Sequence, residues 1–195
     1  MRAGPGAASV GTMQVGSVRL EIVRGSVVEQ DVDAIVNAAN EGMRGGGGVD
    51  GAIHAAAGPG LLAELERVAP RGAPTGTVVV TGGHRLRQRR VLHTPGPVWR
   101  GGGHGEPDLL AACYRGCVEA ADREGLASLA FCSISTGVYG YPLERAAPLA
   151  VRAVRDALAA RPGTSLRRVV FAMWGAREHE VFARALADLA AEGAR

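Results

Sequence analysis

The stretch "VNAANEGMRGGGGVDGAIHAAAGPG", residues 36–60, decides the fold because it leads from a short apolar strand through glycines into a helix-like segment. Two amides, Asn37 and Asn40, precede the run Gly45 to Gly48, and Asp50 follows it. Glycines after a strand let the backbone come close to a ligand, and the N–H groups at a helix start present partial positive charge to an anion. The stretch therefore predicts an anion-binding loop, with phosphate as the simplest ligand; a flexible surface loop is the alternative when the glycines are taken alone.

On both sides of this stretch, strand-like and helix-like segments alternate along the chain. Apolar, strand-like runs cover residues 17–25, 33–39, 76–83, 90–94, 128–135 and 167–174. Helical periodicity covers residues 49–57, 61–68, 108–123, 143–160 and 178–191. Strands interleaved with helices indicate an α/β/α sandwich. We expect residues 1–16, which are small and aperiodic, to be a disordered lead-in, and residues 17–195 to be one domain.

A second loop of the same kind is "ISTGVYGYP", residues 134–142, after another apolar strand. In α/β sheets ligands bind outside the carboxyl ends of the strands, where these two loops would lie. Neither loop carries a Walker A sequence or a clean GxGxxG fingerprint, which argues against magnesium-dependent triphosphate chemistry. A pair of anion-binding loops suggests a diphosphate.

Composition narrows the class of protein further. The 195 residues are 47% apolar with a net charge of +3, and every basic residue is Arg. The cluster "HRLRQRR", residues 84–90, predicts a solvated hairpin end, which makes a nucleic-acid partner the minor alternative. The three cysteines form no CxxC pair, and they indicate reduced core thiols in a cytoplasmic protein rather than a disulfide framework or a metal site. No apolar run is long enough to span a bilayer, so we expect no membrane partner.

Several polar side chains near the first loop admit two interpretations. Asn37 fits a structural amide, whereas Asn40 lies further out, where it could bind a sugar hydroxyl. Asp50 is either a helix N-terminal carboxylate or a catalytic group. His54 and His93 fit structural positions, on a helix and at a strand end.

Four motifs in a fixed order carry a resemblance. "DAIVNAAN", "GGGGVDGAIHAAAGP", "HTPGPVW" and "ISTGVYGYP" together resemble the macro domain family, and within it the MacroD-type ADP-ribosyl hydrolases, over residues 18–191. The resemblance implies a three-layer α/β/α macro domain around a mixed, mostly parallel sheet of about six strands. It also implies an ADP-ribose cleft at the carboxyl edge of that sheet.

The resemblance also implies an activity and roles for residues. It implies an enzyme that removes mono-ADP-ribose from acidic side chains of proteins and deacetylates O-acetyl-ADP-ribose, without a metal or cofactor. Asn40 would clamp the distal ribose and Asp50 would orient or deprotonate the attacking water. The ribose and the diphosphate would bind against two further groups: Gly45, Gly46, Gly47, Gly48 and Val49, and Ser135, Thr136, Gly137, Val138 and Tyr139. The alternatives are a non-catalytic ADP-ribose reader and a binder of another nucleotide or RNA.

The adenine end departs from the family pattern. Most members carry Gly-Asp-Ile-Thr after the first strand, where the Asp accepts a hydrogen bond from adenine, but residues 25–28 here are "GSVV". Ser26 therefore occupies the adenine position, with Asp31 or Asp33 as possible substitutes. Trp174 is the candidate to stack on adenine; a core position for it, with Phe171 facing the cleft instead, is the alternative.

Overall fold

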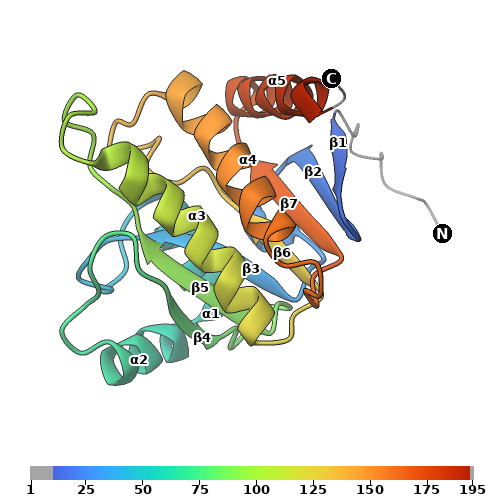
Figure 1. The fold of residues 1–195 in the computed structure, drawn as a ribbon. Helices are drawn as coiled ribbons and strands as arrows, with labels where there is room; N and C mark the ends of the chain where they lie inside the picture. The colour runs from blue at the N-terminus through green and yellow to red at the C-terminus, as the bar shows by residue number, and fades with distance from the viewer. Residues whose placement is uncertain (1–10, 194–195) are drawn as a thin grey trace.

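The computed structural model describes residues 11–193, whose central feature is a seven-stranded sheet ordered β1-β2-β7-β6-β3-β5-β4 (Figure 1). Strands β2, β7, β6, β3 and β5 pair in parallel, while the edge strands β1 and β4 run antiparallel to their neighbours. The parallel strands therefore end at one edge of the sheet. The strands are β1 Thr12–Val15, β2 Val18–Arg24, β3 Ala34–Ala39, β4 Val79–Gly82, β5 Arg90–Pro95, β6 Ser128–Phe131 and β7 Arg168–Met173.

Helices cover both faces of the sheet, which confirms the predicted three-layer fold. In Figure 1, α3 and α4 cross in front of the strands, and α1 lies on the opposite face. Strand β3 shows why both faces must be covered: Val36 packs into the core with α3, α4 and α5, and Ile35 into the core with α1 and α2. The helices are α1 Gly48–Ala57, α2 Pro59–Val68, α3 Glu106–Arg123, α4 Leu143–Ala159 and α5 Ala176–Gly193, with a 3-10 turn, η1, at Val27–Glu29.

The larger core is built around aromatic rings and contains all three cysteines. Phe171 stacks on Phe131 at a centroid distance of 5.3 Å and contacts Phe182 at 5.4 Å. Cys113, Cys117 and Cys132 are all buried free thiols. Burial raises the pKa of Cys117 well above its usual value and that of Cys132 to about 12. The predicted reduced thiols are thus buried and protonated.

The N-terminal part of the prediction requires a correction. Thr12–Val15 were placed in a disordered lead-in, but they form β1, which pairs with β2. Val15 pairs with Val18 across a two-residue turn, and Gly16 supplies the left-handed φ of +58° that such a turn needs. The sheet consequently has seven strands instead of about six, and residues 1–10 of the predicted lead-in lie outside the described residues.

Further observations concern the ends of elements, Pro148 and membrane spans. The strand predicted over 128–135 stops at Phe131, which leaves residues 132–135 to the loop that follows. Helix α4 continues past Pro148, which is its sixth residue. None of the helices within residues 11–193 has the length and apolar character to cross a membrane.

Candidate active site

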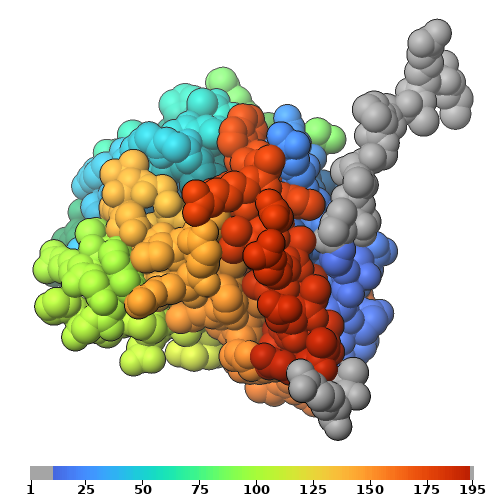
Figure 2. Space-filling view, turned by 90° about the horizontal axis from the view of Figure 1, so that it is seen from above, coloured from blue at the N-terminus to red at the C-terminus, as the bar shows by residue number. Residues whose placement is uncertain are grey.

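A cleft of about 590 Å³ runs along the edge where the parallel strands end, and its size suits a nucleotide-sized ligand. Its walls come from the residues that follow four neighbouring strands: Ser26 after β2, Trp174 after β7, residues 132–139 after β6, and Asn40 with the glycine run after β3. Figure 2 looks onto the molecule from above, where the cyan segment with the glycine run, the yellow-green β5 loop and the amber β6 loop come together.

The glycine run forms one end of the cleft. Gly46, Gly47 and Gly48 line it, and Gly48 begins α1 with a left-handed φ of +59°. A Cβ at Gly46 would lie 3.0 Å from Asp50 Oδ2, so only glycine lets the chain pass so close to the carboxylate. Gly45 was predicted to contact ligand, but it is not among the cleft-lining residues. Its φ is +79°, and its carbonyl accepts a 2.8 Å hydrogen bond from Asn40 Nδ2.

Asp50 is buried at this end of the cleft and is held from behind by Asn37. Asn37 Nδ2 donates to Asp50 Oδ1 at 2.7 Å and contacts His93 Nδ1 at 3.0 Å. Since an amide nitrogen can only donate, His93 Nδ1 accepts, and its Nε2–H donates to Thr81 Oγ1 at 2.9 Å. A buried chain of polar groups thus fixes the orientation of the Asp50 carboxylate.

The two histidines beside Asp50 differ in environment. Burial, together with the nearby His54, lowers the pKa of His93 to about 3, so His93 is neutral at physiological pH. Its predicted structural position is confirmed by its two side-chain partners. His54 packs its ring against Gly45, and its Nε2 lies 3.4 Å from Asp50 Oδ1. His54 therefore adjoins the carboxylate as well as packing α1.

The loop after β6 offers backbone donors to the cleft. Tyr141 N–H donates to the Ser135 carbonyl at 3.0 Å and Gly140 N–H to that of Gly137 at 2.9 Å. From α3, the buried Tyr114 hydroxyl accepts the N–H of Ile134 at 3.0 Å. Within residues 11–193, the N–H groups of residues 136–139 have no protein acceptor, which suits an anion.

Strain in this loop lies at Ser135 rather than at Gly137. Ser135 has a φ of +67°, uncommon for a residue with a side chain, and its buried Oγ has no hydrogen-bond partner in the described residues. Gly140 also has a positive φ, but Gly137 does not. A strained residue with an unpaired buried hydroxyl is typical of a functional site.

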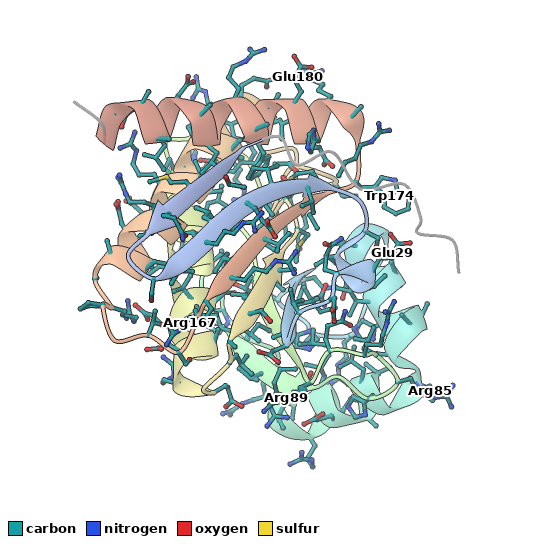
Figure 3. The ribbon with its side chains drawn as sticks, turned by 90° about the vertical axis from the view of Figure 1, so that its right-hand side faces the viewer. Glu29, Arg85, Arg89, Arg167, Trp174 and Glu180 are labelled. Carbon is teal, nitrogen blue, oxygen red and sulfur yellow. The ribbon has the colours of Figure 1, made fainter. Side chains whose placement is uncertain are left out.

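The opposite end of the cleft is formed by Ser26, Trp174 and Glu178. Trp174 is 74% exposed, so it is no core residue, whereas Phe171 is fully buried among the core aromatics. Figure 3 shows Trp174 on the connection between β7 and α5, on the same side of the molecule as Glu29 of η1. Glu178, which the sequence analysis missed, accepts the Gly175 N–H at 3.1 Å.

The two aspartates suggested as substitutes for the missing adenine carboxylate do not reach the cleft. Asp33 precedes β3 and its Oδ2 accepts the N–H groups of Ala127 and Ser128, at the opposite edge of the sheet. Asp31 is not among the cleft-lining residues either. Ser26 itself lines the cleft and donates its backbone N–H to Glu29 at 3.4 Å.

The structure thus brings together all the predicted site residues except Gly45 along one cleft. The charged side chains that line it are Asp50 and Glu178, both acidic, so an anion there would be bound by backbone N–H groups and helix starts. The positioning contact from Asn37 could not be read from the sequence, because it joins residues on β3, β5 and α1.

The fold and this cleft define a three-layer α/β/α domain that offers an anion site beside a fixed carboxylate. The Macro domain family profile matches residues 36–150. A macro domain-containing protein of Caldanaerobacter subterraneus subsp. tengcongensis is 45% identical over 173 residues, covering 88% of this chain and 97% of the relative. The chain belongs to the macro domain family.

Other relatives carry more specific names. A protein of Salmonella newport named O-acetyl-ADP-ribose deacetylase is 51% identical over 140 residues, covering 71% of this chain and 78% of the relative. The Oceanobacillus iheyensis macrodomain with ADP superposes with a TM-score of 0.89 at 37% identity, covering 96% of this chain and all of that one. The Trypanosoma brucei macrodomain in complex with ADP-ribose has a TM-score of 0.78 at 43% identity, covering 86% of this chain and 68% of that one.

Proposed function

We propose that this protein binds ADP-ribose and hydrolyses its esters, removing mono-ADP-ribose from acidic side chains of proteins and deacetylating O-acetyl-ADP-ribose. Relatives named O-acetyl-ADP-ribose deacetylase at 51% identity support the activity, and macrodomain structures with ADP and ADP-ribose support the ligand. The observation that carries the proposal is the buried Asp50 carboxylate, held by Asn37 in the same cleft as the loop after β6, whose N–H groups at residues 136–139 have no acceptor in the part of the chain that the structure describes.

The cleft suggests how ADP-ribose lies in it. Adenine would lie between Ser26 and Trp174, with the indole available for stacking because it is largely exposed. The diphosphate would accept hydrogen bonds from the N–H groups of residues 136–139 and from the start of α1. The distal ribose would then lie between Tyr139 and Asn40, with its reacting carbon beside Asp50.

Asn40 suits a ribose because its amide nitrogen is already held by a hydrogen bond within the protein. Its Nδ2 donates to the Gly45 carbonyl, which orients the side chain and leaves Oδ1 to accept a hydrogen bond from a ribose hydroxyl. An amide that is positioned before the ligand arrives loses little further freedom on binding.

Hydrolysis requires a water molecule to be aimed at the ester. Asp50 would hold this water through Oδ2, since Oδ1 is occupied by Asn37. As the water oxygen bonds to the reacting carbon and the ester C–O bond breaks, Asp50 would accept the proton of the water, and the leaving oxygen would depart as a carboxylate. The fixed carboxylate contributes orientation as well as basicity.

A non-catalytic reader is the main alternative, and a time course separates the two. The protein is incubated with a carrier protein mono-ADP-ribosylated on glutamate, and separately with O-acetyl-ADP-ribose, and released ADP-ribose or acetate is measured. Thermal shift with ADP-ribose, ADP, AMP and poly(A) gives binding in parallel. We expect release from both substrates and the largest shift with ADP-ribose; binding without release would establish a reader instead.

A further inference from the structure

A second cavity, of about 290 Å³, opens beside the cleft at the carboxyl end of β5. Gly96 and Tyr139 line both cavities, so they form the wall between them. Glu41, the neighbour of Asn40 along the chain, lines the second cavity. Burial, and secondarily the carboxylates of Glu41 and Asp50, raise the pKa of Tyr139, consistent with a ring placed between the two sites.

The loop that borders this cavity, residues 96–105, is held in one conformation despite its glycines. The buried Glu106 carboxylate accepts the N–H groups of Arg100 at 2.9 Å, Gly102 at 3.1 Å and His104 at 2.6 Å. Trp99 N–H donates to the Tyr139 carbonyl at 2.9 Å, which ties the loop to the main cleft. A preorganised loop at the mouth of a cavity is suited to recognition.

Among the charged side chains that line this cavity, Arg100 remains available to bind a ligand. Glu106 is engaged by the loop backbone, and Glu41 accepts hydrogen bonds from the N–H and the hydroxyl of Thr75. Within residues 11–193 the exposed Arg100 guanidinium has no ion-pair partner. An apolar side chain, Val98, lines the same cavity and is 47% exposed.

The order of the strands shows which part of a substrate would reach this cavity. In the proposed function, adenine lies at β2 and β7, the diphosphate at β6 and the distal ribose at β3, and β5 is the next strand along the sheet. The group attached to the distal ribose therefore points toward the β5 cavity. In a modified protein that group is the acidic side chain and its peptide.

We infer that the β5 cavity receives the peptide of the ADP-ribosylated protein, with Arg100 binding an acidic side chain that flanks the modified residue. The inference rests on the proposed function, because it takes the distal ribose to lie beside Asp50. The apolar Val98 side chain suits the carbon atoms of the peptide, and the guanidinium suits a flanking carboxylate.

The test compares two peptides that each carry one ADP-ribosylated glutamate, with acidic flanks in one and serine flanks in the other. We expect the parent protein to prefer the acidic peptide by about threefold or more in kcat/KM, the size that an exposed charge pair supports. Arg100→Gln should bring the ratio close to one, and Arg100→Glu should disfavour the acidic peptide. Arg87→Gln, an exposed arginine on the β4–β5 connection, is the matched control and should keep the preference.

Two further measurements separate this inference from the proposed function. O-acetyl-ADP-ribose has no peptide, so its turnover reports the main cleft alone and tests the hydrolase proposal. Calorimetric Kd values for both peptides with Asp50→Ala give the preference while hydrolysis is slowed. Equal affinities for the two peptides, or a preference that survives in Arg100→Gln, would overturn the peptide site even if O-acetyl-ADP-ribose is turned over normally.

Discussion

The buried Asn37 side chain has an unusual set of hydrogen-bonding contacts. Its Nδ2 serves both Asp50 and His93, while its Oδ1 is buried without a partner in the described residues. A buried acceptor left unpaired costs free energy that apolar packing alone would avoid. The arrangement is understandable if the amide is retained to orient Asp50 for chemistry.

The first prediction follows for Asn37→Leu, which keeps the volume but removes the donor. Because Asp50 then loses its fixed orientation, we expect kcat for O-acetyl-ADP-ribose to fall roughly tenfold or more. The affinity for ADP-ribose should change little, since Asn37 does not line the cleft. Steady-state kinetics and calorimetry check this split. A weakened ADP-ribose affinity with an unchanged kcat would mean that Asn37 supports binding and not catalysis.

Asp50 itself gives the second prediction. Asp50→Ala should slow hydrolysis by at least about tenfold, the low end of what a positioned acid or base contributes. The fold should persist, because the side chain ends in the cleft and the Asn37 amide keeps its contact with His93 Nδ1. Asp188→Ala, an exposed carboxylate on α5, is the control. Release of ADP-ribose at the parent rate by Asp50→Ala would refute the catalytic assignment.

Ser26 gives a third prediction, about the adenine end. A carboxylate accepting from the adenine amino group should bind more strongly than a hydroxyl, since charged hydrogen bonds exceed neutral ones by about 1 kcal/mol. Ser26→Asp should thus tighten ADP-ribose binding several-fold. The rate at saturation should barely change, because Ser26 and Asp50 lie at opposite ends of the cleft.

The comparison ligand for Ser26→Asp is IDP-ribose, whose 6-keto base offers no amino group. Titration calorimetry of the parent and the variant with both ligands should show a gain confined to ADP-ribose. Equal or weaker ADP-ribose affinity would count against this role, and Glu29, which already accepts the residue 26 N–H, would be the source of repulsion.

At the scale of residues, the sequence indicated which side chains meet but not how they are held. Asn40, Asp50 and Ser135 could be assigned because each follows a strand in a motif that resembles a known family. The contacts of Asn37 with His93, and the unpaired Ser135 hydroxyl, depend on strands that are distant in sequence and adjacent in the sheet. Long-range geometry of this kind leaves no local pattern.

At the scale of elements, the loops after β5 and β6 are closely packed against each other. A Cβ at Gly96 would lie 2.2 Å from Ser135 Oγ and 2.6 Å from Ile134 Cγ2, so any larger residue would displace the anion-binding loop. Gly137, in contrast, has no atom within 4 Å of its would-be Cβ. The two glycines therefore serve different ends: Gly96 permits packing and Gly137 leaves space in the cleft.

This contrast yields a prediction for Gly137→Val. The protein should fold normally, because the side chain meets open space and φ is not positive, but ADP-ribose binding should be lost as the valine occupies the cleft. Gly163→Val, at another open glycine outside the cleft, is the matched control. Circular dichroism verifies folding and calorimetry measures binding. Unchanged affinity in folded Gly137→Val would remove the diphosphate from this loop.

Element boundaries show where local sequence stops being informative. The five helices were predicted to within two residues at each end, because their periodicity is long and regular. Strand β1 was missed, since four residues carry little pattern and the pairing with β2 decides their conformation. Strand β6 ends four residues early, and beyond its end the Ile134 N–H donates to the Tyr114 hydroxyl of α3 rather than to a neighbouring strand.

For the whole molecule, buried and hydrogen-bonded titratable groups make stability depend on pH. His93 has a folded pKa of about 3 and takes up a proton more readily when unfolded, near its usual 6.5. The unfolded state therefore gains protons first, and stability falls as the pH drops from 6.5 toward 3.

The buried Glu106 carboxylate is the second such group. Burial raises its pKa, but hydrogen bonds from its own N–H and from those of Arg100, His104 and Gly102 lower the pKa to about 2. Its contribution is lost below its usual value of 4.5.

The corresponding prediction compares urea unfolding at pH 7 and pH 5. From the two His93 pKa values, the free energy of unfolding should fall by about 2 kcal/mol between them, at about 1.4 kcal/mol per pK unit. Glu106 adds little in this window. In His93→Gln the fall should shrink by a similar amount; an identical pH dependence in the variant would show that other groups are responsible.

Because all three cysteines are buried, their reaction with an alkylating reagent can report how often the native structure opens. Alkylating reagents attack thiolates, and these thiols are both covered and protonated in the native state, so modification has to wait for the chain to open. Cys132 differs from Cys113 and Cys117 because it also forms part of the floor of the cleft. Mass spectrometry of alkylated protein would therefore time global opening at Cys113 and Cys117. At Cys132 the rate of alkylation would show how strongly a bound nucleotide protects the cleft. No engineered label is needed for this measurement.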